Sequence, residues 1–276
     1  MKNGDYKNIQ IYGDSRGREL WDAFKGVLSA SAMKDGSGST ESQLSGPYYM
    51  NDGNWPATSF YNDRTNKITL RYDKFDSPDG VKEHFLKVYG NNTIISLEKS
   101  GAKFPKIPKI IIISEQVLHQ LRDNDTETLY SKAEKILKFE LLPFLKEITS
   151  KSNSLVIFYE CEKVEVNNYN VLRSNVEQKN SYINKWNMLL RNLIPDVSDT
   201  TSTNFTNNRI FRISANLKTA LSPIQNETLL TEGIHLAWKR VGEIVTPQSL
   251  LVDVSILLNL VCNRFYGEEY CCSGVL

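Results

Sequence analysis

Two short stretches near opposite ends of the chain hold residue types that together can carry out acyl transfer. Residues 13–15 read Gly-Asp-Ser and follow an apolar run, whereas residues 232–235 read Glu-Gly-Ile-His in a polar loop. A serine hydroxyl can attack an acyl carbon while a histidine takes its proton and a carboxylate orients the imidazole. The predicted roles are nucleophile for Ser15, general base and then acid for His235, and orienting acid for Glu232.

Ser15 also has a simpler interpretation, as the N-cap that starts a helix. Gly13 allows a sharp turn at little steric cost, and the N–H of Ser15 would then lie at a helix N-terminus, which is suited to half of an oxyanion hole. The run from Gly13 to Gly17 also matches the nucleophile elbow of α/β-hydrolases. That fold is not expected, because here the serine follows the first strand and the acid and base share one turn.

Hydrophobic periodicity predicts an alternation of strands and helices that would position these residues. The first expected strand ends at Gly13, and the other four span residues 67–75, 109–114, 154–159 and 209–214. The expected helices span 16–30, 77–89, 126–149 (kinked or ended by Pro143), 175–193 and 247–264. We expect residues 31–66 to form a long irregular loop.

This order predicts one α/β domain over residues 1–276, a three-layer α/β/α structure with a mainly parallel, flavodoxin-like sheet of five strands. Ligands of such sheets bind outside the carboxyl ends of the strands. Ser15, Ser114 and the loops after Tyr159 and Ser214 are expected to meet at that edge.

Composition excludes several classes of function. The 276 residues carry a net charge of +1, so we expect no nucleic-acid partner. No apolar run is long enough for a transmembrane segment, and residues 1–5 do not resemble a signal peptide, so the chain taken as complete is expected in the cytoplasm.

The four cysteines and three histidines show no metal-ligand spacing, so no metal is expected. Cys262 could pair with Cys271 or Cys272, or all the thiols could be free.

The two motifs, at opposite ends of an α/β chain of this size, resemble the SGNH or GDSL hydrolase superfamily. The runs at 13–20, 232–236 and 257–263 and the pair at 271–272 resemble the luminal catalytic domain of the sialic acid O-acetyltransferase family, a PC-esterase-like branch. The resemblance covers nearly the whole chain. It implies an SGNH hydrolase-like fold, a location in the Golgi lumen, and transfer of acetyl from acetyl-CoA to a glycan hydroxyl through an acetylated Ser15, with no bound cofactor.

Two positions depart from the family pattern. Glu232 stands where the family has Asp, and Asp196 and Asp199 are alternative acids for the histidine. The family's small residues after the third strand are replaced by the Ser-Glu-Gln run that starts at Ser114.

The second oxyanion donor is therefore not fixed by the motif. We assign oxyanion or substrate-binding roles to Asp14, Arg16, Arg18 and Ser114, with the N–H of Ser15 as the first donor. The alternatives to the transferase are an esterase of carbohydrate acetyl groups, which needs the same triad, and a non-catalytic SGNH-like binding protein.

Overall fold

The fold comes from a computed structural model of the chain. It describes residues 7–34, 58–63, 68–90, 107–114, 126–162, 176–197, 209–214, 239–241, 244–246, 250–251 and 253–258.

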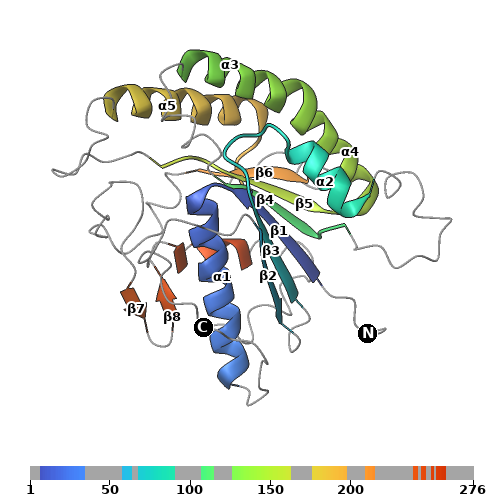
Figure 1. The fold of residues 1–276 in the computed structure, drawn as a ribbon, viewed down its shortest axis with the longest axis vertical. Helices are drawn as coiled ribbons and strands as arrows, with labels where there is room; N and C mark the ends of the chain where they lie inside the picture. The colour runs from blue at the N-terminus through green and yellow to red at the C-terminus, as the bar shows by residue number, and fades with distance from the viewer. Residues whose placement is uncertain are drawn as a thin grey trace.

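A six-stranded sheet forms the centre of the molecule (Figure 1). Its strands are β1 (Lys7–Gly13), β2 (Thr58–Asp63), β3 (Ile68–Lys74), β4 (Ile110–Ser114), β5 (Leu155–Tyr159) and β6 (Ile210–Ile213), and they lie in the order β2-β3-β1-β4-β5-β6. Five strands, β3, β1, β4, β5 and β6, run parallel, whereas β2 pairs antiparallel with β3 at one edge. The adjacent strands β4 and β5 are buried along their whole length, as expected for parallel strands covered on both faces.

The five parallel strands follow the 2-1-3-4-5 order of flavodoxin-like sheets. In this order the chain leaves β1 toward one side and later returns to its other side as β4. The carboxyl ends of β1 and β4 therefore flank the topological switch point, where such sheets bind ligands. Gly13 and Ser114, the last residues of these strands, are register partners there.

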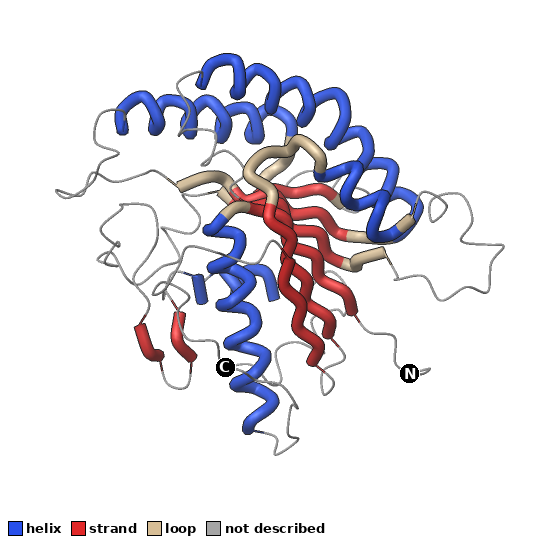
Figure 2. Tube along the Cα trace, in the orientation of Figure 1, coloured by secondary structure: helices blue, strands red, loops and turns tan. Residues whose placement is uncertain are grey.

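Helices cover both faces of the sheet and make two separate hydrophobic cores (Figures 1 and 2). The described helices are α1 (Ser15–Lys34), α2 (Val81–Tyr89), α3 (Thr126–Ile136), the π-helix η2 (Leu137–Leu141), α4 (Leu142–Ser152) and α5 (Val176–Leu193), followed by helical residues at 250–251 and 253–258. One core joins the sheet to α2, η2, α4 and α5, with Phe85, Leu141 and Trp186 among its members. The other joins the sheet to α1 and to the helical residues at 250–251 and 253–258, through Leu20, Phe24 and Leu257. The α/β architecture is thus confirmed, with helical layers on both sides.

The predicted number of strands was wrong. The sheet has six strands and is mixed, because β2 lies within residues 31–66, which we expected to be irregular. The strand is short and polar in sequence, and its Ser59 and Thr58 give no alternating apolar signal. An antiparallel edge strand of this kind is stabilised by pairing with β3 rather than by a periodic apolar pattern.

The long helix that starts at residue 126 continues past Pro143, but with a π-helical segment just before it. The helix continues through η2 into α4, and Pro143 lies in the first turn of α4. Proline removes one N–H from the ladder and its ring crowds the preceding turn, so a π-bulge just before it is a common accommodation. Phe139 within η2 is 75% exposed.

A small hairpin, β7 (Lys239–Val241) paired with β8 (Ile244–Thr246), was not predicted and contacts α1 through β8. Figure 1 shows it beside α1, apart from the main sheet. None of the helices in the described ranges is both long and apolar enough to cross a membrane.

Candidate active site

The turn after β1 puts Ser15 at the first helical position of α1. Asp14 is the N-cap, since its carbonyl accepts the N–H of Arg18 at 3.1 Å and its Oδ1 accepts the N–H of Arg16 at 2.9 Å. The interpretation of Ser15 as the N-cap was therefore wrong, because a neighbouring carboxylate does that work. Ser15 is half-buried, and no described group hydrogen bonds to its hydroxyl. The hydroxyl is left available at a helix N-terminus, where the helix dipole favours developing negative charge.

The ends of β1 and β4 pack so closely that only glycine fits at position 13. A Cβ on Gly13 would lie 2.7 Å from the carbonyl oxygen of Ser114 and 3.2 Å from its Cβ. At Gly17, one helical turn further on, an added Cβ would make only an ordinary 3.5 Å contact with the Ser114 Cβ. Ser114 itself is buried against this turn. The predicted proximity of the Ser15 and Ser114 segments at one edge of the sheet is confirmed.

Tyr72 of β3 fixes the same turn from the other side. Its hydroxyl lies 2.8 Å from the carbonyl oxygen of Asp14 and 3.1 Å from that of Gly13, and can donate to either. Burial, with the nearby Asp14 carboxylate, raises the pKa of Tyr72 well above its usual value, so the phenol keeps its proton. The N–H of Phe75 also donates to the Gly13 carbonyl at 2.8 Å. The backbone on the N-terminal side of Ser15 is thus held by β3 and by the residue that directly follows it.

The two arginines among the candidate oxyanion residues, Arg16 and Arg18, point in different directions. The Arg16 guanidinium is only 5% exposed and forms an ion pair with Glu162, beyond β5, with 2.5 Å between Nη1 and Oε2. The Arg18 guanidinium pairs with Asp22 at 3.1 Å, donates to the Ser59 hydroxyl of β2, and lies over the Trp21 ring at 4.5 Å. These contacts give Arg18 a structural part in joining α1 to β2, while Arg16 reaches across the sheet edge.

The segment after β5 is held by a dense set of contacts that the sequence did not indicate. Glu160 is completely buried and accepts from Arg191 of α5 at 2.8 Å through both oxygens, and from Arg212 of β6 at 2.7 Å. The backbone N–H of the next residue, Cys161, donates to the Asn187 side chain at 2.9 Å, and its carbonyl accepts back from Asn187 at 2.8 Å. Cys161 is buried and is not part of a disulfide. A carboxylate, an amide and two arginines thus fix the backbone that leads to Glu162.

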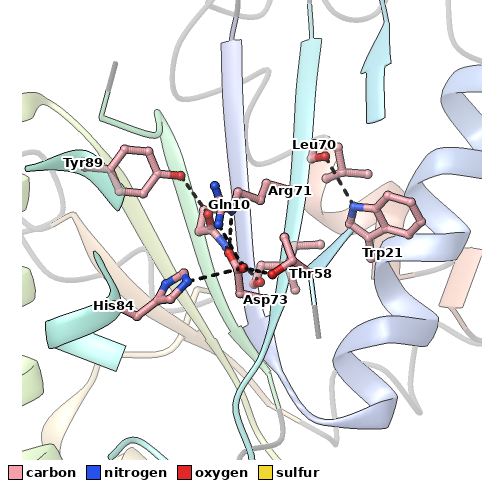
Figure 3. Close-up of polar contacts among 9 residues, drawn as sticks. Gln10, Trp21, Thr58, Leu70, Arg71, Asp73, His84 and Tyr89 are labelled. Atoms are coloured by element: carbon pink, nitrogen blue, oxygen red, sulfur yellow. Dashed lines mark hydrogen bonds and ion pairs between the residues drawn. The ribbon is translucent and has the colours of Figure 1, made fainter. Parts of the chain in front are cut away.

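A second buried polar network lies on the face of β1 and β3 that α2 covers, around Asp73 (Figure 3). The Asp73 carboxylate accepts from Gln10 at 2.9 Å, from Arg71 at 2.7 Å and 3.1 Å, and from Thr58 at 2.8 Å. His84 of α2 adds an Nε2–Oδ1 contact of 3.4 Å.

This network links three strands to α2. Tyr89 of α2 donates to Gln10 at 2.7 Å, and Gln10 in turn donates to Asp73. These residues were not predicted from the sequence, because polar side chains that alternate with apolar ones along a strand are ordinarily assigned to the solvent face. The long-range partner of a buried carboxylate has no local signal.

Burial and neighbouring charges act in opposite directions on the pKa values of Asp73 and His84. Burial alone would raise the pKa of Asp73, but the hydrogen bonds from Arg71 and Thr58 outweigh it and hold that pKa below its usual value. Burial lowers the pKa of His84, although the Asp73 carboxylate acts in the opposite direction. The lowered pKa of His84 leaves its imidazole neutral at neutral pH, in contact with the Asp73 carboxylate.

The acid and base of the predicted triad, Glu232 and His235, lie outside the described residues, as do Asp199 and the cysteines at 262, 271 and 272. Asp196, one alternative acid, pairs with Arg212 at 2.8 Å. Among the described ranges, no group of His, Cys, Asp and Glu side chains is arranged to hold a metal ion.

Comparison with protein-family models and with curated proteins found no match to this chain.

Proposed function

We propose that the chain is a serine-dependent O-acetyltransferase that moves acetyl from acetyl-CoA to a glycan hydroxyl. The observation that carries the proposal is the position of Ser15. It starts α1 directly at the switch point of the sheet, with its hydroxyl not used for capping, in a turn fixed by Tyr72 and by the contact of Gly13 with Ser114. Preorganisation of this degree, at the edge where α/β sheets bind ligands, supports a nucleophile more than a structural serine. The acid and base are proposed on the sequence motif at Glu232 and His235.

The proposed reaction has two steps. Ser15 Oγ attacks the thioester carbonyl carbon while His235 takes its proton, and the resulting oxyanion is stabilised by the Ser15 N–H and by Arg16. Collapse breaks the C–S bond, and the proton on His235 passes to the leaving thiolate. The acceptor hydroxyl then gives its proton to His235 and attacks the acetyl-serine, and the proton returns to Ser15 as the ester bond of the intermediate breaks.

The acceptor is proposed to be a sialic-acid-like sugar, and the location the Golgi lumen, on the resemblance alone. The lumenal location can be checked separately by following the native chain in cells with an antibody against it, beside Golgi and cytosolic markers.

Acetylation of Ser15 tests the proposal directly. Wild-type protein and the Ser15→Ala variant are incubated with acetyl-CoA, and peptides are analysed by mass spectrometry. The expected result is an acetyl adduct on Ser15 that is absent from the variant and is discharged faster by a sugar acceptor than by water. Discharge by water at the same rate with every acceptor would favour the esterase instead.

Hydrolysis of a simple uncharged ester distinguishes the enzyme from a non-catalytic binding protein. Hydrolysis of p-nitrophenyl acetate by wild type should exceed that by Ser15→Ala by at least about 1000-fold, the scale on which triad members contribute. Equal rates for the two proteins would leave the non-catalytic binding protein as the remaining interpretation.

A further inference from the structure

The ion pair between Arg16 and Glu162 lies across the carboxyl edge of the sheet. Arg16 is three residues beyond the end of β1, and Glu162 is three residues beyond the end of β5. Strand β4 lies between these two strands. Neighbouring strands are about 4.8 Å apart, so the pair bridges roughly 10 Å over the end of β4. It crosses the region that Ser15 and Ser114 flank.

The two partners are supported very differently by the surrounding chain. Arg16 follows Ser15 in the first turn of α1, and its backbone N–H is bound by the Asp14 cap. Glu162 is on a segment whose preceding residues are fixed by Arg191, Arg212 and Asn187. The Glu162 side chain is 28% exposed, whereas Arg16 is 5% exposed. A carboxylate placed by a rigid backbone therefore holds the more buried guanidinium in one direction.

A pair of this kind is poorly explained by stability. Taking a guanidinium and a carboxylate out of water costs several kcal/mol per ion, and apolar residues of similar volume are often at least as stable. A guanidinium held at the edge of the sheet where the chain turns into α1 is, however, suited to stabilising an oxyanion formed there.

We propose that Glu162 is a positioning residue that holds the Arg16 guanidinium over the end of β4, so that Arg16 supplies the fixed positive charge of the site. This inference rests on the proposed function and adds to it a residue that the motifs did not indicate. Glu162 itself touches no reacting atom in this scheme and acts only through Arg16. Its effect should therefore vanish when Arg16 is absent.

A double-mutant cycle tests that dependence on the full chain. The rate of Ser15 acetylation by acetyl-CoA is measured for wild type, Glu162→Gln, Arg16→Gln and the double variant. Arg16→Gln should slow acetylation about 100- to 1000-fold, as removal of one oxyanion donor does. Glu162→Gln should slow it by up to about 100-fold, mainly in the maximal rate and with little change in KM, because a guanidinium is displaced but not removed.

The double variant should be no slower than Arg16→Gln alone. Glu162→Asp, which keeps the charge, should recover part of the rate. Glu147→Gln, which breaks a 2.6 Å ion pair with Lys151 on α4, is the matched control and should leave the rate unchanged. Additive losses in the double variant, or a wild-type rate in Glu162→Gln, would overturn the inference.

A measurement without turnover keeps the two proposals distinguishable. The Nε–Hε signal of Arg16 in NMR spectra of labelled protein should report an immobile guanidinium in wild type and in Glu147→Gln, but a mobile one in Glu162→Gln. A mobile Arg16 side chain in wild type defeats the positioning role, whatever the activity. If Arg16 is immobile but Ser15 is never acetylated, the proposed function is wrong, and so is the catalytic role given to Arg16. The positioning of Arg16 by Glu162 would still be supported.

Discussion

The carbonyl oxygen of Ser114 lies 2.7 Å from the point where a Cβ on Gly13 would be. That single approach joins the last residues of the two central strands and sets where the turn to Ser15 begins. It also means that the position of the candidate nucleophile depends on the absence of a side chain.

Replacement of Gly13 by alanine should therefore destabilise the fold and disturb Ser15. The added methyl must displace β4 or the turn, and overpacking of this kind costs roughly 1–3 kcal/mol. The free energy of unfolding in urea and the rate of Ser15 acetylation are the two measurements. Gly17→Ala is the matched control, since its Cβ meets only an ordinary contact and alanine favours a helix by about 0.5–1 kcal/mol. Equal stability of the two variants would contradict the assigned packing.

Loss of the Tyr72 hydroxyl should weaken the turn without leaving a cavity. Tyr72→Phe removes the donor to the carbonyls of Gly13 and Asp14, and a net hydrogen bond contributes about 1 kcal/mol. Tyr182→Phe removes a hydroxyl bonded to the exposed Glu127 and should change unfolding by less than about 0.5 kcal/mol. Chemical denaturation compares them. A cost no greater for Tyr72→Phe than for Tyr182→Phe would argue against a supporting role.

Asp73 is expected to be the most sensitive position of the network in Figure 3. Asp73→Asn leaves Arg71 and Gln10 facing an uncharged amide in a buried setting, and breaking a buried ion pair typically costs about 3–5 kcal/mol. Because Arg71 is 27% exposed, we expect the lower end of that range or less. Asp79→Asn, which loses a surface contact with Lys132, should stay near wild type in the same denaturation assay. Matching unfolding free energies for these two variants would refute the prediction.

His84 and Asp73 should together make the protein less stable as the pH falls. The folded pKa of His84 is lowered, so the unfolded chain binds its proton first and stability declines once the pH falls through about 6.5, the unfolded value. The folded pKa of Asp73 is also lowered, so its contribution is present above about pH 3.9 and is lost as the pH falls through the folded value.

Urea unfolding between pH 8 and pH 3 measures the profile. His84→Gln should flatten the upper part only, between about pH 6.5 and the lower folded pKa of His84. An unchanged slope in that interval would show that His84 does not titrate as the buried geometry requires.

Glu160, which follows β5, should contribute as much to the free energy of unfolding as Asp73 does on β3. It is completely buried between Arg191 and Arg212, so Glu160→Gln leaves two guanidinium groups without their shared carboxylate. We expect a loss of about 3 kcal/mol in unfolding free energy and a slower Ser15 acetylation, because the backbone that carries Glu162 loosens. Glu134→Gln, in an i,i+4 pair with Lys138, is the control. Wild-type stability in Glu160→Gln would contradict the described burial.

Strands β4 and β5 could be predicted because each is a nearly continuous apolar run, such as Ile110–Ser114, as expected of a strand covered on both faces. The turn at Ser15 could be located because its residue types are locally informative. Strand β2 could not be predicted from the sequence, since it is defined by its pairing with β3, which joins mainly polar residues. The partners of Asp73 and Glu160 were missed for the same reason: Asp73 and His84 are on different elements, and Arg191 is 31 residues from Glu160. The capping residue of α1 could not be decided from the sequence, because Asp14 and Ser15 are both good N-caps and only the backbone path of the chain decides between them.

The core beneath α1 has a consequence for the way the protein is made. Leu20, Trp21 and Phe24 share that core with Leu250, Val254 and Leu257, which are synthesised more than 200 residues later. Chains fold as they emerge, and apolar surface without its partners is prone to association. While the rest of the sheet can form on the ribosome, the helix that begins at Ser15 lacks part of its packing until the region around residue 257 has left the exit tunnel. The candidate nucleophile would thus reach its final geometry only after that region has been synthesised, which delays any acyl chemistry until then.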